Sequence, residues 1–284
     1  MNNNKQQWWE KFWSERSPSI GTNDREAESW TDLVWQVGLE ELNTSLLRLT
    51  AGKKMLECGC GQATVSRYLA KRGYDCTMLD YSSQALALAK TSFALNSLKG
   101  EFVLGDMNHL PFNADQFDIV YTGGVLEFFN DINAPLREIV RVLKPGGVLA
   151  INIVPNKFSC QTLGDIERTL VHALKNLLLL RWREIFIRLN HLPPGVSRTS
   201  LKEYVSALEL AGLKNVTGYS VTPFPALSLG RRGERAYVRL LNRLLPYWRK
   251  FNHSHYVWSE RWGMAYTIYG AKPETMPVNK KSGD

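Results

Sequence analysis

The amino-acid sequence predicts an α/β fold in which parallel strands alternate with helices that cross over the sheet. From Lys53 onward, short apolar runs alternate with segments of helical period, as in a parallel sheet with crossover helices. A glycine-rich turn at Gly59 to Gly61 separates the first apolar run from the first helical segment. Hydrophobic residues make up 44% of the 284 residues and charged residues 22%, which excludes a disordered or fibrous chain. We expect one enlarged domain.

The first half of the chain supplies the repeating units of this sheet. The first strand is predicted over Lys54 to Cys58, and the helix after the turn from about Ala63 to Lys71. Further strands are expected over Tyr74 to Asp80, Phe102 to Leu104, Phe117 to Tyr121 and Gly147 to Val154, the last after the Lys144-Pro-Gly-Gly turn. Another helix is expected up to about Asn96, with Ser82 or Ser83 as the residue that caps its start. A further helix is expected from Ala134 to Leu143.

Informative residues stand where the predicted strands end. Ligands bind outside the carboxyl ends of the strands in an open α/β sheet, so function is expected there. Small residues after Glu57 let the backbone approach a ligand and expose N–H groups at a helix N-terminus. Asp80 stands 23 residues after Glu57, where a carboxylate can accept both hydroxyls of a ribose. Asp106 and Met107 follow the third strand and suit the amine and the ring face of an adenine. Three strand ends therefore match one nucleoside.

A dinucleotide site is the main alternative for the glycine-rich turn. Its fingerprint, GxGxxG or GxGxxA, would require a small residue at position 64 after Gly59 and Gly61. Thr64 stands there, and the small residue is Ala63. The spacing therefore indicates a different loop.

Five sequence pieces occur together in a recognisable order. They are Glu57-Cys-Gly-Cys-Gly-Gln-Ala63, Leu79-Asp80-Tyr-Ser, Gly105-Asp106-Met107 with Leu110-Pro-Phe112, Phe117-Asp118 with Val125-Leu126-Glu127, and Arg141-Val-Leu-Lys-Pro-Gly-Gly147. With these pieces the segment from Met55 to Asn156 resembles the small-molecule, type 11-like branch of class I S-adenosylmethionine-dependent methyltransferases, with Ala63 in place of the family's third loop glycine. The resemblance implies S-adenosyl-L-methionine as cofactor, bound by Glu57, Gly59, Gly61, Asp80, Tyr81, Asp106, Met107, Gly123 and Glu127.

The same resemblance implies the rest of the architecture. The fold would be a Rossmann-like three-layer sandwich whose seven-stranded, mostly parallel sheet has an antiparallel last strand. A helix over Ser200 to Ala211 and strands over Leu213 to Val221 and Gly263 to Ala271 would complete it. The chain would then divide into a helical lid or cap (1–52), the methyltransferase domain (53–272) with helical insertions after strands five and six (157–197 and 223–259), and a polar tail (273–284).

The chemistry expected of such a site needs little from side chains. Methyl transfer is an in-line displacement at a carbon already activated by a sulfonium, so positioning can supply most of the rate enhancement. Many relatives carry a His after the Val-Leu-Glu stretch, whereas Phe128 and Phe129 follow Glu127 here. No residue is therefore assigned as a catalytic base.

Charge and apolar patterning point to partners for the second half of the chain. Residues 1–155 carry 15 Lys/Arg and 18 Asp/Glu, and residues 156–284 carry 20 and 9. A basic half suits a membrane surface, a phosphorylated substrate or nucleic acid, or is simply a solvated face. Two apolar sets recur at helical spacing beside arginines: Leu170, Leu174, Leu177, Leu178, Trp182 and Ile185, and Tyr237, Leu240, Leu241, Leu244 and Leu245. Such helices either touch anionic lipid or pack on their own domain.

The expected acceptor is a small molecule that is partly apolar, such as a lipid or lipid-linked compound. Nucleic-acid methylation is a weaker alternative, because Tyr121-Thr-Gly-Gly124 stands where amino-methylating relatives place an Asp/Asn-Pro-Pro-aromatic tetrad. A cofactor-binding scaffold without catalysis is a third possibility. Trp8, Trp9, Phe12 and Trp13 could form a lid over the cofactor or pack on the sheet.

A cytoplasmic protein with peripheral membrane contact is expected. The N-terminal segment lacks the features of an export signal, and no apolar stretch reaches the ~18 residues needed to span a bilayer. The four cysteines lack the paired spacing of a zinc site, so no metal is expected. We expect the cysteines to be reduced thiols.

Overall fold

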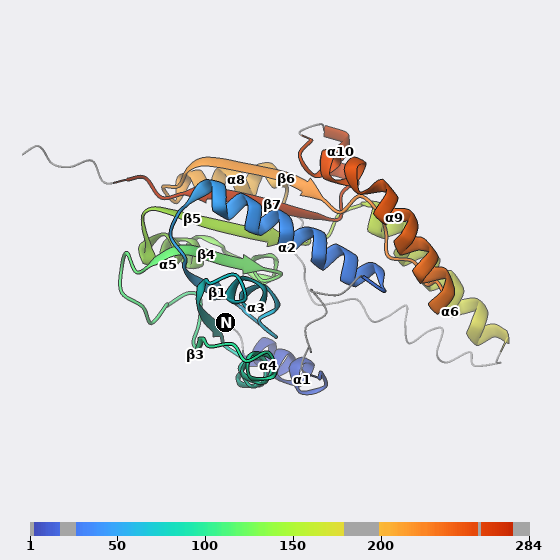
Figure 1. The fold of residues 1–284 in the computed structure, drawn as a ribbon, viewed down its shortest axis with the longest axis horizontal. Helices are drawn as coiled ribbons and strands as arrows, with labels where there is room; N and C mark the ends of the chain where they lie inside the picture. Colours follow the sequence, from blue (N-terminus) through green and yellow to red (C-terminus); the bar gives the residue numbers. More distant parts are fainter. Residues whose placement is uncertain (1–2, 18–26, 179–198, 255–256, 275–284) are drawn as a thin grey trace, which may run out of the picture.

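A seven-stranded sheet organises the part of the chain that the computed structural model describes, which is residues 3–17, 27–178, 199–254 and 257–274 (Figure 1). Its order is β3-β2-β1-β4-β5-β7-β6. The strands are β1 (Lys54–Cys58), β2 (Asp75–Asp80), β3 (Glu101–Leu104), β4 (Phe117–Gly123), β5 (Leu143–Ile153), β6 (Lys214–Val221) and β7 (Ala265–Ala271). Strands β1 to β5 pair in parallel, and β7 lies antiparallel between β5 and β6. The predicted mostly parallel sheet with an antiparallel last strand is confirmed.

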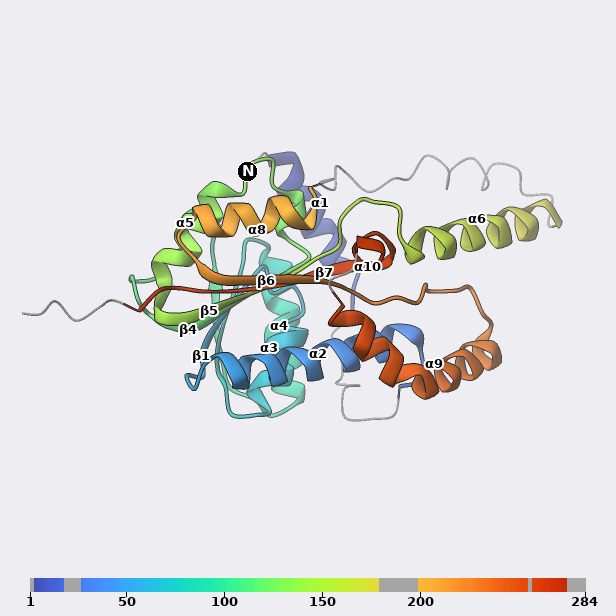
Figure 2. The same ribbon diagram turned by 90° about the horizontal axis from the view of Figure 1, so that it is seen from above.

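Helices cover both faces of this sheet and make three layers (Figure 2). One face packs on α2 (Trp30–Leu49), α3 (Thr64–Ala70) and α4 (Ser83–Leu95), and the other on α5 (Asn133–Val142) and α8 (Leu201–Leu210). Neighbouring strand residues alternate between the two cores: Met55 belongs to the first and Leu56 to the second, and both are fully buried. This alternation explains why the strands read as continuous apolar runs.

Polar side chains fix where several helices begin. Ser82 caps α4, since its side-chain oxygen accepts a hydrogen bond from the Ala85 N–H at 3.2 Å. Ser29 and Asp32 form a capping box at the start of α2, and Ser200 and Glu203 form one at the start of α8. The sequence had left Ser82 and Ser83 as equal candidates, and the structure selects Ser82.

Strand β5 begins earlier than the sequence predicts. The turn expected at Lys144 to Gly147 is incorporated into the strand, because Leu143 already pairs with Phe117 of β4. The glycines still disturb the strand: Gly146 has a φ of +74°, and the pairing register shifts between Phe117 and Ile119. The glycines therefore produce an irregular strand rather than a turn that separates two elements.

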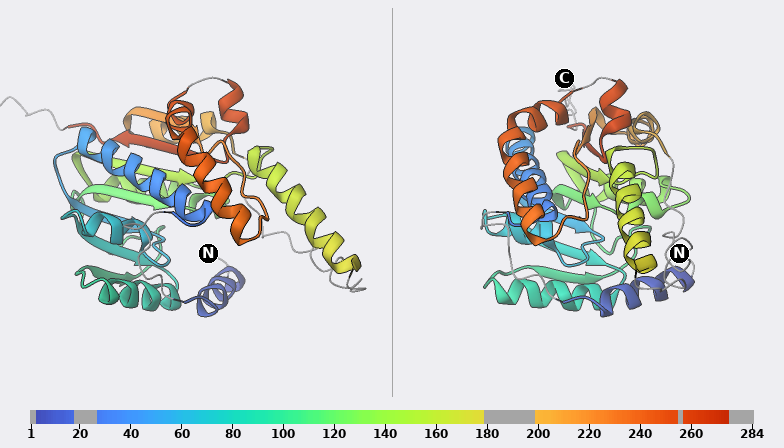
Figure 3. Two further views of the ribbon diagram at one scale, coloured as in Figure 1. Left: turned by 45° about the vertical axis from the view of Figure 1, so that its right-hand side comes forward. Right: turned by 90° about the vertical axis from the view of Figure 1, so that its right-hand side faces the viewer.

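The remaining helices gather at the end of the sheet where the parallel strands finish (Figures 1 and 3). They are α1 (Asn3–Ser14), α6 (Cys160–Leu178), α9 (Arg231–Asn252) and α10 (Val257–Trp262), with the 3₁₀ turn η1 (Leu126–Phe128) between β4 and α5. A separate apolar cluster joins α2 and α9 and consists of Leu33 and Val37 of α2 with Val238, Leu241 and Trp248 of α9. Trp182 and Ile185, and positions 275–284 of the predicted tail, lie outside the described residues.

Candidate functional site

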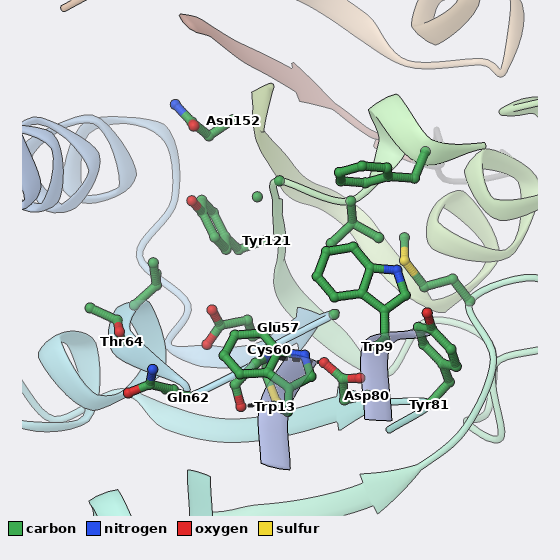
Figure 4. A pocket seen from close by; sticks show the side chains of 18 of the residues that line it. Trp9, Trp13, Glu57, Cys60, Gln62, Thr64, Asp80, Tyr81, Tyr121 and Asn152 are labelled. Carbon is green, nitrogen blue, oxygen red and sulfur yellow. Dashed lines mark hydrogen bonds between the residues drawn. The ribbon is translucent and has the colours of Figure 1, made fainter. Parts of the chain in front are cut away.

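The carboxyl ends of the parallel strands surround a cavity of about 560 Å³ (Figure 4). Its lining brings together eight of the nine side chains or backbone positions predicted from the sequence: Glu57, Gly59, Gly61, Asp80, Tyr81, Asp106, Met107 and Gly123. They come from four different strand ends and the segments that follow them. The sheet therefore assembles at one place residues that are up to 66 positions apart, from Glu57 to Gly123.

The loop after β1 packs closely against neighbouring side chains because it carries glycine at two positions. Gly59 and Gly61 have φ angles of +69° and +51°. A Cβ atom on Gly59 would lie 2.4 Å from Val125 Cγ2, and one on Gly61 would lie 2.6 Å from Trp13 Cη2. Both the backbone conformation and the close neighbours require glycine there.

Ala63 shares the left-handed conformation of the loop. Its φ is +55°, and it precedes the first residue of α3. The resemblance had placed it at the family's third glycine, and the angle explains why a glycine suits that position. An L-residue in this conformation carries strain of about 1–2 kcal/mol, which the surrounding buried contacts of Ala63 hold in place.

Asp80 connects the end of β2 to the glycine-rich loop. Its Oδ2 accepts a hydrogen bond from the Gly61 N–H and its Oδ1 one from the Ser82 N–H, both at 2.9 Å. Burial raises the pKa of this carboxyl, and the hydrogen bonds from Ser82 and Gly61 oppose the shift. Each carboxylate oxygen has a second acceptor position. The group can therefore hold the loop and still accept ligand hydroxyls.

Glu57 places a second acidic group in the cavity. Its Oε2 accepts a hydrogen bond of 2.9 Å from the Ser66 N–H in α3. The side chain is buried, and this burial raises its pKa to about 7, with the nearby charge of Asp80 acting in the same direction. A cationic ligand beside Glu57 would favour its ionised form.

The turn after β3 is held by its own side chains. Asp106 Oδ1 accepts hydrogen bonds from the backbone N–H and the side-chain amide of Asn108, at 2.9 and 2.8 Å. Met107 follows with its side chain buried against the core. The turn thus presents a fixed carboxylate and a polarizable side chain to the cavity.

Glu127 is the one predicted cofactor residue that does not line the cavity. It lies in η1, where its Oε1 accepts a hydrogen bond of 3.1 Å from the Val154 N–H just after β5. Its Oε2 is buried without a hydrogen-bond partner among the described residues, and burial raises its pKa to about 7. The contact supports the backbone beside the cavity, and cofactor binding by Glu127 stays a prediction.

Helix α1 closes one side of the cavity. Trp9, Phe12 and Trp13 line it, as their spacing on one helical face allows, whereas Trp8 does not. Glu10 fixes the helix in place: its carboxylate accepts hydrogen bonds from the Ser82 hydroxyl and from the Ser83 and Gln84 N–H groups, at 2.9, 2.9 and 3.2 Å. The sequence had indicated the aromatic residues but not Glu10, whose partners are more than 70 positions away.

A second cavity of about 250 Å³ adjoins the first. The two share the lining residues Thr31, Trp35, Val65, Tyr121, Asn152 and Val154. The second cavity extends between α2, the β5–β7–β6 part of the sheet and α9. Tyr121 and Asn152, both visible in Figure 4, therefore stand where the two spaces meet.

Comparison with known proteins agrees with this geometry. Residues 56–151 match the family model described as "Methyltransferase domain". The chain therefore carries, over about a third of its length, the methyltransferase domain that its sequence predicts, and S-adenosylmethionine is the cofactor that this resemblance implies. The matched range contains β2 to β4, most of β1 and β5, and every predicted cofactor residue.

Individual methyltransferases resemble the chain over different lengths. Malonyl-[acyl-carrier protein] O-methyltransferase of Enterobacter lignolyticus is 34% identical over 97 residues, which cover 34% of this chain and 37% of that protein. Methyltransferase GfsG of Streptomyces halstedii is 28% identical over 196 residues, 68% of each chain. A putative sarcosine dimethylglycine methyltransferase from Galdieria sulphuraria has the same fold, with a TM-score of 0.55 at 15% identity over 96% of this chain and 100% of that one. The chain spans about two fifths of the length of the malonyl-[acyl-carrier protein] methyltransferases that it matches.

The cavity suits the cofactor of class I methyltransferases. The Tyr81 hydroxyl is buried there without a hydrogen-bond partner among the described residues. At Gly61 the absence of a side chain lets Trp13 of α1 lie directly against the loop beside the cavity. Two carboxyl groups, Glu57 and Asp80, match a ligand that has ribose hydroxyls and a positive charge. The polar groups present are thus those that such a nucleoside requires.

Proposed function

We propose that the chain transfers a methyl group from S-adenosylmethionine to a small, largely apolar acceptor held in the second cavity. The observation that carries this proposal is the junction of the two cavities at Tyr121 and Asn152. When bound, the cofactor supplies a methyl group activated by the sulfonium. Asp80 would hold the ribose hydroxyls, Glu57 the positively charged end, and Asp106 with Met107 the adenine.

The lining of the second cavity favours an uncharged, apolar acceptor. Aliphatic and aromatic side chains from α2, α9 and the sheet make most of its wall. Among its described lining residues there is no Lys, Arg or His, and Glu41 is the only carboxylic acid. Asn252 donates hydrogen bonds to both oxygens of Glu41, at 3.1 and 2.9 Å. A phosphate-rich acceptor would find no positive charge in this wall, so the lining disfavours a nucleic acid.

One polar group in this wall is available to orient the acceptor. The indole Nε1 of Trp248 is buried and has no hydrogen-bond partner among the described residues. A buried donor without a partner is costly. An acceptor with a carbonyl, ether or hydroxyl oxygen would satisfy it.

Positioning, rather than a protein base, accounts for the proposed reaction. The polar side chains at the junction are Thr31, Tyr121 and Asn152. Burial raises the pKa of Tyr121 well above its usual range, so its hydroxyl stays protonated and acts as a hydrogen-bond donor. These groups can align an acceptor atom, and alignment contributes up to ~7–11 kcal/mol. The acceptor atom must then be nucleophilic without losing a proton to a side chain.

The acceptor is proposed to be a lipid or an acyl compound. The relatives named malonyl-[acyl-carrier protein] O-methyltransferase act on an acyl group, and the apolar second cavity supports a similar class here. None of the described helices is long and apolar enough to cross a membrane. We propose a location in the cytoplasm with peripheral contact to a membrane, which the basic second half of the chain supports.

Transfer of radioactivity from methyl-tritiated cofactor tests the proposal. Purified protein is incubated with a lipid extract, an aqueous small-molecule extract and total RNA. Label in the lipid or small-molecule fraction is expected, and Asp80→Ala should abolish most of it, whereas Asp75→Ala, at the exposed opposite end of β2, should not. Label in RNA alone would establish the nucleic-acid alternative, and cofactor binding without any transfer would establish a scaffold.

A further inference from the structure

Helix α6 presents an apolar row that the described part of the chain leaves exposed. Six apolar side chains lie on one side of this 19-residue helix and are between 43% and 65% exposed: Leu163, Ile166, Leu170, Val171, Leu174 and Leu177. We call these six residues the α6 row. Phe158 just before the helix and Trp258 on α10 are also exposed. A contiguous apolar surface of this kind marks an interaction site rather than ordinary surface.

Helix α9 presents a basic face at the same end of the molecule. Six of its cationic side chains are exposed, and none of them is in an ion pair within the described residues: Arg231, Arg232, Arg235, Arg239, Arg243 and Lys250. We call these six residues the α9 basic face. Leu240 and Tyr247 are exposed on α9 as well. The opposite side of the helix packs on α2 through Val238, Leu241 and Trp248, so the basic side points outward.

The segment between β6 and α9 fixes both helices to the body of the protein. The Ala226 N–H donates to Gln161 Oε1 and the Ser228 N–H to Glu167 Oε2 of α6, at 3.2 and 2.8 Å. The Tyr237 hydroxyl of α9 donates to the Pro225 carbonyl at 3.0 Å. Figures 2 and 3 show α6 and α9 projecting from the same end of the sheet on either side of this segment.

We infer that the α6 row and the α9 basic face together dock the protein on a membrane surface that carries anionic lipid headgroups. Apolar side chains would enter the acyl boundary, and the arginines would pair with headgroup phosphates. The positive charge of the α9 basic face favours an anionic bilayer over a second copy of this chain as the partner. A second copy would bring a like-charged α9 face, whereas an anionic bilayer is complementary. The α9 helix also walls the second cavity through Trp248 and Asn252, so docking brings that cavity to the bilayer. The inference rests on the proposed apolar acceptor and names where the protein would meet it.

Vesicle sedimentation tests this surface. The full chain is mixed with vesicles of phosphatidylcholine alone or of phosphatidylcholine with phosphatidylglycerol, at low and high salt. Binding is expected only to the anionic vesicles, and it should weaken as salt shortens the Debye length from ~10 Å at 0.1 M to ~3 Å at 1 M. The combined variant Arg235→Glu, Arg239→Glu and Arg243→Glu should lose about a hundredfold in affinity or more. The variant Leu170→Ser with Leu174→Ser should lose at least about tenfold, because it removes two apolar side chains that would enter the bilayer.

Matched controls and a separate readout distinguish a wrong surface from a wrong function. Leu210→Ser on α8 and Lys214→Glu on β6 change exposed residues at the other end of the sheet and should leave vesicle binding unchanged. Cofactor affinity, measured by calorimetry on every variant, should also be unchanged. Equal binding to neutral vesicles, unaltered binding by either surface variant, or stronger binding to single-stranded RNA than to anionic vesicles would overturn the inference. Loss of cofactor binding in the unmodified chain would instead remove the proposed function.

Discussion

At the scale of single residues, Asp80 has the most consequential position. Its carboxylate fixes the glycine-rich loop through the Gly61 N–H and closes the turn after β2 through the Ser82 N–H. Sequence spacing alone predicted that Asp80 binds a ribose, but it could not predict that the same group also positions the loop. A substitution there removes both contributions.

We predict that Asp80→Ala weakens cofactor binding by ~1–3 kcal/mol, because ribose hydroxyls are left unpaired in a buried site. Isothermal titration calorimetry with S-adenosylhomocysteine measures this directly. Asp75→Ala is the matched control, since Asp75 is exposed at the opposite end of the same strand. Equal affinities of the two variants would remove Asp80 from the site.

Glu57 makes cofactor binding depend on pH. Burial raises its pKa to about 7, so the free protein holds a proton on this carboxyl below that pH. A cation bound beside it favours the ionised form and therefore releases the proton. Affinity should rise with pH, by up to about tenfold per unit below 7, and level off above.

Calorimetry in buffers of different ionisation enthalpy would detect the released proton. Glu57→Gln cannot release it and should bind with a much flatter pH profile. Should the unmodified protein show the same flat profile around pH 7, Glu57 does not face the positive charge.

Several residues of the site could not be found in the sequence, for a common physical reason. Glu10, Trp248 and the Glu41–Asn252 pair act through contacts with residues far away along the chain. No local period or spacing encodes such contacts. Asn152 did leave a signal, because it is the one polar side chain in the otherwise apolar stretch from Val148 to Val154, but that signal was not used.

At the scale of elements, the strands were the most predictable features. Apolar runs are local properties, so β1, β2 and β4 appear close to where they were expected. The start of β5 was wrong by four residues, since pairing of Leu143 with Phe117 overrides the turn preference of Pro-Gly-Gly. Tertiary pairing, which a single sequence does not display, decided that boundary.

Helix α1 depends on Glu10 for its attachment over the cofactor cavity. The carboxylate accepts three hydrogen bonds at the N-terminus of α4, where a negative charge is favourable. Glu10→Ala should cost about 1 kcal/mol, as loss of a helix cap does, and should loosen α1. We expect faster limited proteolysis within α1 and weaker cofactor binding.

Glu15→Ala serves as the control for α1, because Glu15 is exposed just beyond the same helix. A cleavage rate in Glu10→Ala no faster than in Glu15→Ala would show that Glu10 does not hold the helix. The predicted lid role of residues 1–52 would then lose its support.

The attachment of α6 depends on the absence of a side chain at Gly164. A Cβ atom there would lie 2.2 Å from the Ala226 carbonyl oxygen, and that backbone atom cannot move without displacing the segment before α9. Gly164→Ala should therefore destabilise the protein by ~1–3 kcal/mol, although alanine is the better helix former. Urea denaturation measures this change.

The comparison variant is Gly38→Ala in α2, where an added Cβ meets nothing within 4 Å. It should stabilise the protein by ~0.5–1 kcal/mol through helix propensity. If both variants shift stability in the same direction, the close approach of α6 to Ala226 is not a real constraint.

At the scale of the whole molecule, the fold shows where the excess positive charge of the second half of the chain lies. The basic second half includes α9, whose outward face carries six cations. The cavities lie at the same end, so electrostatic attraction to an anionic surface would also orient the acceptor cavity. The sequence predicted the asymmetry, but only the fold places the charges beside the site.

The central claim is that one nucleoside cavity, formed by four strand ends, delivers a methyl group toward the space behind Tyr121 and Asn152. A crystal structure with S-adenosylhomocysteine bound tests it most directly. We predict ribose hydroxyls on the Asp80 carboxylate, the adenine beside Asp106 and Met107, and the sulfur directed at the junction of the two cavities. Density for the ligand at another place, or a sulfur directed away from that junction, would contradict the account.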